Sequence, residues 1–389
     1  MPLKAVSIDN RSSRKAKTLL SLLAGLAVVL VAVGDAGLFR LQADPSSVLA
    51  ADKGRPAAGG AWDRVAPALK DQFVKDFEEA EDAQEVFARY LPVLGAPAIL
   101  DHLERRESHC HSQAHDLGRA LYAERGRLND ALAVCDHACT NGCMHGVMAE
   151  AAGHLRGAEA VHKLVAVCTG ESHGPHHRPG NCAHAVGHGL LAQAGGGDEP
   201  NPADRSLPKA LAGCRVFDSL PMRYYCATGV FMAYKDILDD LKADGRPPAR
   251  ASRHDPCDRF ADVAPACYRY LLPHIAEALH LDRERMAEEC LRLGGRLRLG
   301  CFHGLGMLGL DDVAREPAAL ETLCRAGGDD EQTVCIEGAI EKLADYNEQE
   351  AMAACRLLTG HAAAVCLEAA KGKMYRLAKP SMPLYVSGD

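Results

Sequence analysis

Aromatic residues are scarce in this chain of 389 residues, where they make up 5% of the sequence and include a single tryptophan. Strands prefer aromatic and β-branched residues. No segment shows the alternation of apolar and polar residues that is typical of a half-buried strand. Alanine, leucine and glycine are abundant instead. These features predict an all-α fold of closely packed helices.

Several functional motifs are missing as well. The sequence contains no Walker loop, no G-x-S-x-G nucleophile turn and no CxxCH haem-attachment site. GLGMLG at 304–309 fits G-x-G-x-x-G, but the strand that nucleotide binding needs is not expected before it. The net charge is −8 and no basic run follows the N-terminal region, which argues against a nucleic-acid partner. We therefore expect no nucleotide, no haem and no nucleic acid.

Cysteine, in contrast, is plentiful, with sixteen residues. An even number at ordered spacing favours disulfides in an oxidising compartment. The N-terminus predicts the same location, because four basic residues between Arg11 and Lys17 precede an uncharged apolar run at 18–34. This charge order keeps the first residues in the cytoplasm and exports the rest. The run is either a retained anchor, although it is short for one, or a cleaved signal peptide with small residues between Ala32 and Ala36.

The chain therefore divides into four predicted parts. They are a basic cytoplasmic N-terminus (1–17), a transmembrane anchor or signal segment (18–34), a linker rich in alanine, glycine and proline (35–61), and an extracytoplasmic Cys-rich helical domain (62–389). We expect a single-pass membrane protein or a secreted one, periplasmic or extracellular, whose contact with the membrane is made by the N-terminal segment.

The cysteines form two series. One series opens an apolar, helix-like segment each time, and the other lies near the end of the preceding helix. From Cys168 onward, each cysteine of the second series precedes an opening cysteine by 10 to 14 positions. The expected disulfides are 168/182, 214/226, 257/267, 290/301, 324/335 and 355/366, which involve Cys168, Cys182, Cys214, Cys226, Cys257, Cys267, Cys290, Cys301, Cys324, Cys335, Cys355 and Cys366.

The opening cysteines recur every 31 to 44 residues. Periods in this range are typical of stacked helical hairpins. We predict about eight disulfide-stapled hairpins in a solenoid that could close into an α/α ring. Cys110, Cys135, Cys139 and Cys143 remain, and they can pair in three ways. We favour 135/143, because its separation is nearer to the others, which leaves 110/139.

Short hairpins with regularly placed cysteines over residues 84–380 resemble the disulfide-stapled Sel1/TPR-like helical-repeat proteins. The resemblance implies stacked α-hairpins. The staples here span 10–14 positions, which is longer than in that family, and its Ala/Leu/Gly consensus is not legible. We therefore carry no functional residue over from it.

Histidine supplies the clearest functional signal. Two positions beyond each opening cysteine from Cys143 onward lies a row of mostly polar residues, which we expect to line one face of the array: His145, His184, Thr228, Arg269, His303, Glu337 and Glu368. The pairs His111/His115 and His184/His188 are four residues apart, so each pair shares one helix face and can reach one ion. Glycines beside the histidines would let the helices approach closely: Gly118, Gly146, Gly187, Gly189, Gly304 and Gly306.

We therefore predict a metal site with six imidazole ligands: His111, His115, His145, His184, His188 and His303. Such a donor set suits copper, zinc or non-haem iron. Two groups of three would give a binuclear oxidative site, and one group with an open position would suit Lewis-acid chemistry. His303 can join only if the array curves. Asp116 and Glu150 are candidates to support the ligands or to act as a base.

Two alternatives remain open. The histidines could bond backbone carbonyls at helix junctions and serve packing alone. The other alternative is that the protein is a metal-free scaffold that binds a peptide or a protein on its concave face. The sequence does not decide whether there is a reaction, and it identifies neither a substrate nor a metal.

Overall fold

The computed structural model describes residues 60–106, 110–155, 159–169, 179–195, 202–246 and 250–372. Within these ranges the chain forms helices and no strand. All of them belong to one compact unit. The predicted all-α fold is confirmed.

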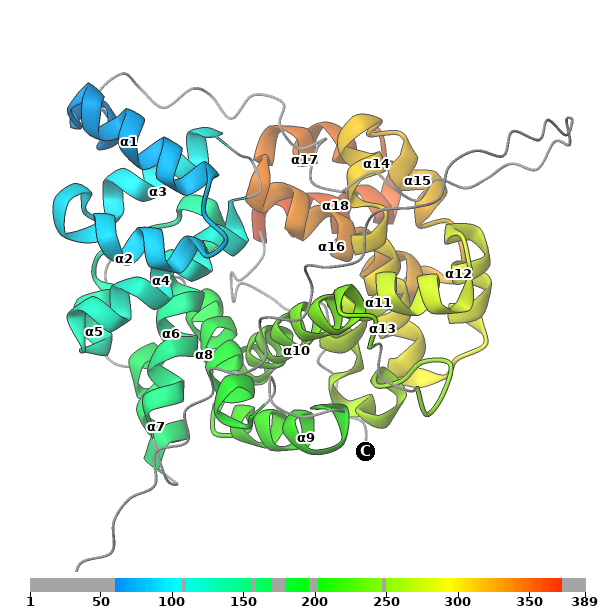
Figure 1. Ribbon diagram of the computed structural model, residues 1–389. Coiled ribbons are helices and arrows are strands. Elements are labelled where there is room, and N and C mark those ends of the chain that lie inside the picture. Colours follow the sequence, from blue (N-terminus) through cyan, green and yellow to red (C-terminus); the bar gives the residue numbers. More distant parts are fainter. Residues whose placement is uncertain are drawn as a thin grey trace, which may run out of the picture. The chain divides into compact units, whose positions relative to one another are not determined.

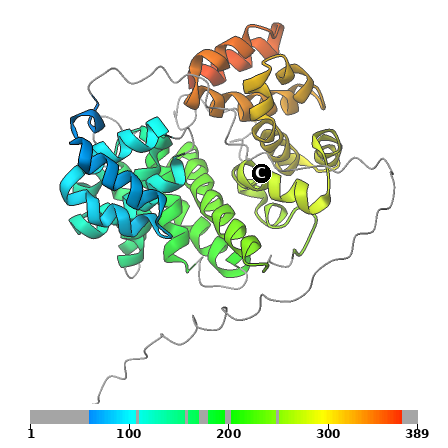
Figure 2. The same ribbon diagram turned by 45° about the horizontal axis from the view of Figure 1, so that its top comes forward.

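Nine helices form a continuous row in which each helix packs against the next (Figures 1 and 2). We call them the row helices, and they are α2 (Ala83–Leu94), α4 (His111–Arg125), α6 (Gly142–His154), α8 (Pro179–Gln193), α10 (Leu220–Ala243), α11 (Ala264–Leu279), α13 (Gly295–Leu308), α16 (Asp329–Tyr346) and α18 (Gly360–Gly372). Neighbouring hairpins stack on each other through their second helices, as the repeat units of a helical array do. The predicted helical repeat is therefore present.

The remaining helices precede or flank the row helices. They are η2 (Trp62–Arg64), α1 (Pro67–Glu78), α3 (Ala96–Arg106), α5 (Leu128–Leu132), η3 (Ala138–Asn141), α7 (Glu159–Thr169), α9 (Pro202–Cys214), η4 (Cys257–Arg259), η5 (Ala261–Val263), α12 (Arg283–Leu291), α14 (Leu310–Arg315), α15 (Ala319–Leu323) and α17 (Glu348–Cys355). Four clear hairpins are α7–α8, α9–α10, α12–α13 and α17–α18, whose members contact each other.

Eight disulfides cross-link the helices of the array. Six join the expected pairs, 168/182, 214/226, 257/267, 290/301, 324/335 and 355/366. The first four cysteines pair as Cys110–Cys139 and Cys135–Cys143, which is the favoured one of the three possibilities. Five of the six tie the C-terminal end of one helix to the first half of the next, and Cys257–Cys267 ties the short helix η4 to α11. Each staple therefore restricts the unfolded chain at a hairpin.

Glycines bring certain row helices into backbone contact. A Cβ atom on Gly146 of α6 would lie 2.0 Å from the carbonyl oxygen of His115, and one on Gly118 of α4 would lie 2.1 Å from that of Cys143. Only glycine permits such an approach. The same reciprocal arrangement joins α8 to α10 and α13 to α16, through Gly187, Gly229, Gly306 and Gly338. The expectation that glycines beside the histidines allow close packing is confirmed.

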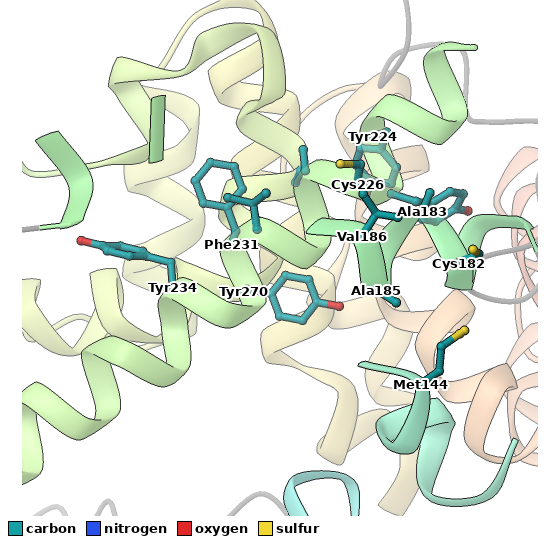
Figure 3. Close-up of a cluster of buried hydrophobic side chains, with 14 of the residues drawn as sticks. Met144, Cys182, Ala183, Ala185, Val186, Tyr224, Cys226, Phe231, Tyr234 and Tyr270 are labelled. Atoms are coloured by element: carbon teal, nitrogen blue, oxygen red, sulfur yellow. The ribbon is translucent and has the colours of Figure 1, made fainter. Parts of the chain in front are cut away.

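Apolar side chains fill the space around these contacts. Val186 of α8, Cys226 of α10 and Phe231 of α10 are buried, and Figure 3 shows them in one cluster with Tyr270 of α11. This packing holds α8 against α10 and fixes which residues face each other across the contact.

The predicted N-terminal parts, 1–17 and 18–34, lie outside the described residues, as does the linker apart from Gly60 and Ala61. Among the helices that are described, none combines the length and the apolar character needed to cross a bilayer. The presence of eight disulfides, together with no free cysteine in the part of the chain described, suits an oxidising environment outside the cytoplasm.

Candidate metal centre

Three histidines from two helices meet at one point. Nε2 of His115 lies 3.1 Å from Nε2 of His111 and 3.3 Å from Nδ1 of His145. The third side of the triangle, from His145 Nδ1 to His111 Nε2, is also 3.3 Å. We call His111, His115 and His145 the first group. Their nitrogens are arranged as the ligands of one ion would be.

A second group consists of His145, His184 and His188, whose ligand nitrogens lie within 4.8 Å of one another. Nε2 of His188 is 3.2 Å from Nε2 of His184. The ring centres are 4.7 Å (145 to 184), 4.8 Å (145 to 188) and 5.0 Å (184 to 188) apart. His145 therefore belongs to both groups, and five of the six predicted ligands form one cluster.

Local structure explains the pairs, and packing explains the cluster. His111 and His115 lie one turn apart on α4, and His184 and His188 lie one turn apart on α8. Helix α6 packs against both α4 and α8 and carries His145 between the two pairs. A residue on the middle helix is thus shared by its two neighbours.

The loop before α6 fixes the orientation of His111. Nδ1 of His111 donates to the carbonyl oxygen of Cys139 at 2.9 Å and lies 2.8 Å from Oγ1 of Thr140. Cys139, Thr140 and Asn141 have φ values of 51°, 51° and 66°, a left-handed conformation that costs energy for residues other than glycine. The disulfide Cys110–Cys139 ties this loop to the start of α4, so the strained backbone presents its carbonyl to the ring.

His184 is oriented by a hydroxyl group on the next row helix. Thr228 Oγ1 donates its hydrogen to the carbonyl oxygen of Tyr225 at 2.6 Å. It therefore accepts from Nδ1 of His184, which is 2.8 Å away. Since Nδ1 carries the hydrogen, Nε2 of His184 presents a lone pair to the second group, as Nε2 of His111 does in the first.

Burial keeps the five rings neutral. It lowers the pKa of His111 to about 4, helped by the charge of Lys342, and the pKa of His188 to about 3, helped by the charge of His111. Burial is also the main cause that lowers the pKa of His115, His145 and His184 well below 6.5. Neutral imidazole is the form that binds metal.

Hydrogen bonds alone do not satisfy the first group. Each neutral imidazole has one N–H, and His111 uses its own at Nδ1. His115 and His145 can therefore supply at most two N–H hydrogens between them. The three nitrogen–nitrogen contacts of the first group, at 3.1–3.3 Å, would need three hydrogens to be hydrogen bonds. In addition, Nε2 of His145 is buried and has no hydrogen-bond partner, which is costly without a ligand. A cation fits the donor set better than a hydrogen-bond network does.

His303 is the predicted ligand that the structure does not bring to the cluster. It is buried on α13, and its Nε2 lies 3.5 Å from Nη1 of Arg269. The same Nη1 lies 3.2 Å from the hydroxyl of Tyr224 and 3.2 Å from Oε2 of Glu341. His303 thus belongs to a separate buried polar centre around Arg269, because α10 and α11 separate α13 from α8 in the row.

The two predicted carboxylates also have other neighbours. Asp116 pairs with Arg119 at 2.5 Å, and Glu150 pairs with His154 at 3.2 Å. Neither belongs to the two histidine groups. Asp116 directly follows His115, and Glu150 lies five residues beyond His145; both are partly exposed.

The polar row does not line an open face. Five of its seven members are buried at the contacts between row helices: His145, His184, Thr228, Arg269 and His303. The expectation of a polar binding surface was wrong there, because glycine contacts close the space between the helices. Only Glu337 and Glu368, near the C-terminal end of the row, are accessible in part or fully.

Three contributors to these sites were not assigned a role from the sequence. Thr228 orients His184, Thr140 contacts His111, and Glu341 pairs with Arg269. The position of Thr228 in the same row as the histidines was a usable signal. Nothing local in the sequence marks Thr140 or Glu341.

Comparisons with protein-family models, with curated proteins and with solved structures gave no match. The resemblance to Sel1/TPR-like repeats stays a prediction, and function must be inferred from the centre itself.

Proposed function

We propose that this is an extracytoplasmic helical-repeat protein that binds a transition metal, copper or zinc, through the buried histidine cluster. The observation that carries the proposal is the triangle of nitrogens from His111, His115 and His145, with sides of 3.1, 3.3 and 3.3 Å. An ion with metal–nitrogen bonds of 2.0–2.1 Å and tetrahedral angles places its ligands about 3.3 Å apart. The nitrogens therefore stand where such an ion needs them.

The donor chemistry narrows the choice of metal. Neutral imidazoles suit copper and zinc, whereas magnesium and calcium need oxygen ligands. Non-haem iron usually has a carboxylate beside two histidines, and neither group includes one. The cysteines of the described part are all in disulfides, so thiolates do not compete. Copper and zinc are favoured over iron for this reason.

An ion held by one group would still have a coordination position for a ligand from outside the protein. Three protein nitrogens leave at least one position of a tetrahedral ion open, which is the pattern of a reactive zinc or copper site. Positive charges on Lys342, Lys235 and Arg119 act on the cluster, and neither group supplies a carboxylate. We expect hydroxide or a small anion in the open position, because it balances the charge of the ion.

The location of the protein is part of the same proposal. Eight disulfides need an oxidising compartment. The apolar run at 18–34, with basic residues before it, supports export with the N-terminus as a membrane anchor or as a signal peptide. Metal would then be acquired outside the cytoplasm.

The test is metal analysis of protein produced in an oxidising compartment without a His tag. After removal of metal and titration with Cu²⁺ or Zn²⁺, at least one equivalent should remain bound through dialysis. The double variants His111→Ala/His115→Ala and His184→Ala/His188→Ala should each bind less, and the fourfold variant should bind none. His162→Ala removes an exposed histidine on α7 and should change nothing.

Absence of bound metal in the wild-type protein would end the proposal and favour the metal-free scaffold. That alternative has less support, because the polar row that was to bind a peptide is largely buried. Circular dichroism and the absence of free thiols would establish that each variant has folded.

A further inference from the structure

His145 differs from His111 and His184 because neither of its ring nitrogens is hydrogen-bonded to a group outside the cluster. Nδ1 lies 3.3 Å from Nε2 of His115 and 3.3 Å from Nε2 of His111. The opposite nitrogen, Nε2, is buried without a hydrogen-bond partner. The side chain as a whole is 1% exposed, so bulk solvent does not reach that nitrogen.

His111 and His184 cannot play this part. His111 donates from Nδ1 to the carbonyl of Cys139, and His184 donates from Nδ1 to the hydroxyl of Thr228. The other nitrogen of each ring, Nε2, contacts a histidine of its own group. His145 alone appears in both groups, and it sits on α6 between α4 and α8.

The second group is also compact enough for an ion of its own. Nε2 of His184 and Nε2 of His188 are 3.2 Å apart. The centre of the His145 ring is 4.7 Å from that of His184 and 4.8 Å from that of His188. Three imidazoles on one ion, with bonds of 2.0–2.1 Å, have ring centres about 5 Å apart.

We infer that His145 bridges two metal ions, binding one through Nδ1 with His111 and His115 and the other through Nε2 with His184 and His188. This inference rests on the proposed metal-binding function and specifies its form: a binuclear centre joined by one imidazole ring. Binding of the second ion forms a metal–nitrogen bond and breaks the remaining N–H bond of His145. The proton passes to solvent, and the ring becomes an imidazolate.

The bridge accounts for two features together. The negative charge of an imidazolate offsets part of the charge that two ions bring into a site with no carboxylate. It also gives a partner to Nε2 of His145, which is buried and has no hydrogen-bond partner. Because the ligand is shared, occupation of one position affects the other.

Metal stoichiometry in matched variants tests the bridge. With Cu²⁺ as the probe, the wild-type protein should bind two equivalents. His111→Ala should retain one equivalent, in the second group, and His184→Ala should retain one, in the first. His145→Ala should lose tight binding of both, with the dissociation constant of each raised at least about 100-fold. His162→Ala should retain two.

Electron paramagnetic resonance of the wild-type protein gives an answer that needs no variant. Two Cu²⁺ ions joined by an imidazolate are magnetically coupled, so at low temperature the spin count per copper should fall well below one. The spin count per copper should return to one when the wild-type protein is loaded with one equivalent of Cu²⁺, or when His184→Ala is loaded with Cu²⁺.

The bridge would be overturned by a wild-type stoichiometry of one, by two uncoupled coppers with a full spin count, or by one equivalent held at wild-type affinity in His145→Ala. Each of these results leaves the proposed metal binding intact. A wild-type protein that binds no copper would remove both.

Discussion

Thr228 and His184 are joined by a buried hydrogen bond of 2.8 Å that crosses from α10 to α8. The hydroxyl of Thr228 donates to the carbonyl of Tyr225, and it can therefore only accept from the ring. A single hydroxyl on one repeat thus decides which ring nitrogen of a histidine on the preceding repeat carries the hydrogen.

We expect Thr228→Val to weaken metal binding in the second group by about 10–100-fold, because partners that orient a ligand ring have effects of that size. The protein should also lose about 1–3 kcal/mol of stability, since the N–H of His184 stays buried without an acceptor. Metal titration and urea unfolding measure the two effects.

Thr228→Ser should restore most of the affinity. Thr333→Val is a matched control, because it removes a hydroxyl that lies 3.1 Å from His361 in an exposed contact and belongs to neither histidine group. Equal affinities for Thr228→Val and the wild type would contradict the assigned role.

Removal of the disulfide Cys110–Cys139 should affect both folding and the first group. Its loop of 29 residues corresponds to about 3.5 kcal/mol in the loop-closure estimate. The left-handed loop would relax without it, and His111 would lose the carbonyl of Cys139. We expect Cys110→Ser/Cys139→Ser to lower the unfolding midpoint and to weaken metal binding by the first group.

Cys355→Ser/Cys366→Ser provides the comparison. This staple between α17 and α18 closes a loop of 11 residues, so its removal should destabilise the protein by about 3 kcal/mol and leave metal affinity unchanged. If both double variants reduce affinity equally, the loss would reflect global unfolding rather than the position of His111.

The close contact of α8 with α10 predicts a strong effect of Gly229→Ala. The added Cβ would lie 1.8 Å from the carbonyl oxygen of His184, so the helices must separate and carry His184 away from Thr228. We expect a loss of about 3 kcal/mol, at the upper end for overpacked sites, together with weaker metal binding. Chemical denaturation and titration report on each.

Gly153→Ala is the control on a neighbouring row helix. A Cβ there meets no atom within 4 Å, and alanine favours a helix by about 1 kcal/mol over glycine. This variant should be as stable as the wild type or more so. A wild-type melting curve for Gly229→Ala would show that the contact is not as tight as described.

The metal-free protein should lose stability as the pH falls below about 6.5. The folded-state pKa is about 4 for His111 and about 3 for His188, whereas histidine in an unfolded chain titrates near 6.5. Between these values the unfolded state binds more protons, so the unfolding free energy rises with pH, by up to about 1.4 kcal/mol per unit for each such group.

Urea unfolding between pH 7.5 and 4.5 measures this slope under non-oxidising, non-reducing conditions that keep the disulfides intact. His188→Leu should reduce the slope of the unfolding free energy against pH by the contribution of one histidine, whereas His162→Ala should not alter this slope. A free energy that stays constant over this range would show that the rings are not held neutral by burial.

Much of the architecture could be predicted from local spacing. A staple of 10–14 residues between two apolar segments can only close a short hairpin, and the histidine pairs at i and i+4 lie on one face of any helix. The glycines next to those pairs indicated the contacts between helices, because a residue without a side chain lets two helices approach closely. These inferences need no knowledge of the rest of the fold.

The membership of the cluster was different, because it depends on which helices meet. His145 and His303 occupy the same position in their repeats, two residues after an opening cysteine. In the structure α6 lies between two histidine-bearing helices, so His145 is shared, whereas α13 brings His303 to Arg269. The repeat pattern predicts the same role for both residues, and only the packing of the helices shows that one belongs to the cluster and the other does not.

The helices, their disulfides and the faces that carry imidazole could all be predicted from the sequence, since each follows from residues close together in the chain. The tertiary structure alone decided that five rings converge, that the polar row is buried, and that the hydroxyl of Thr228 and the carbonyl of Cys139 set the ring tautomers. Convergence requires backbone contact between successive helices, and that contact depends on interactions between residues 30 to 44 positions apart.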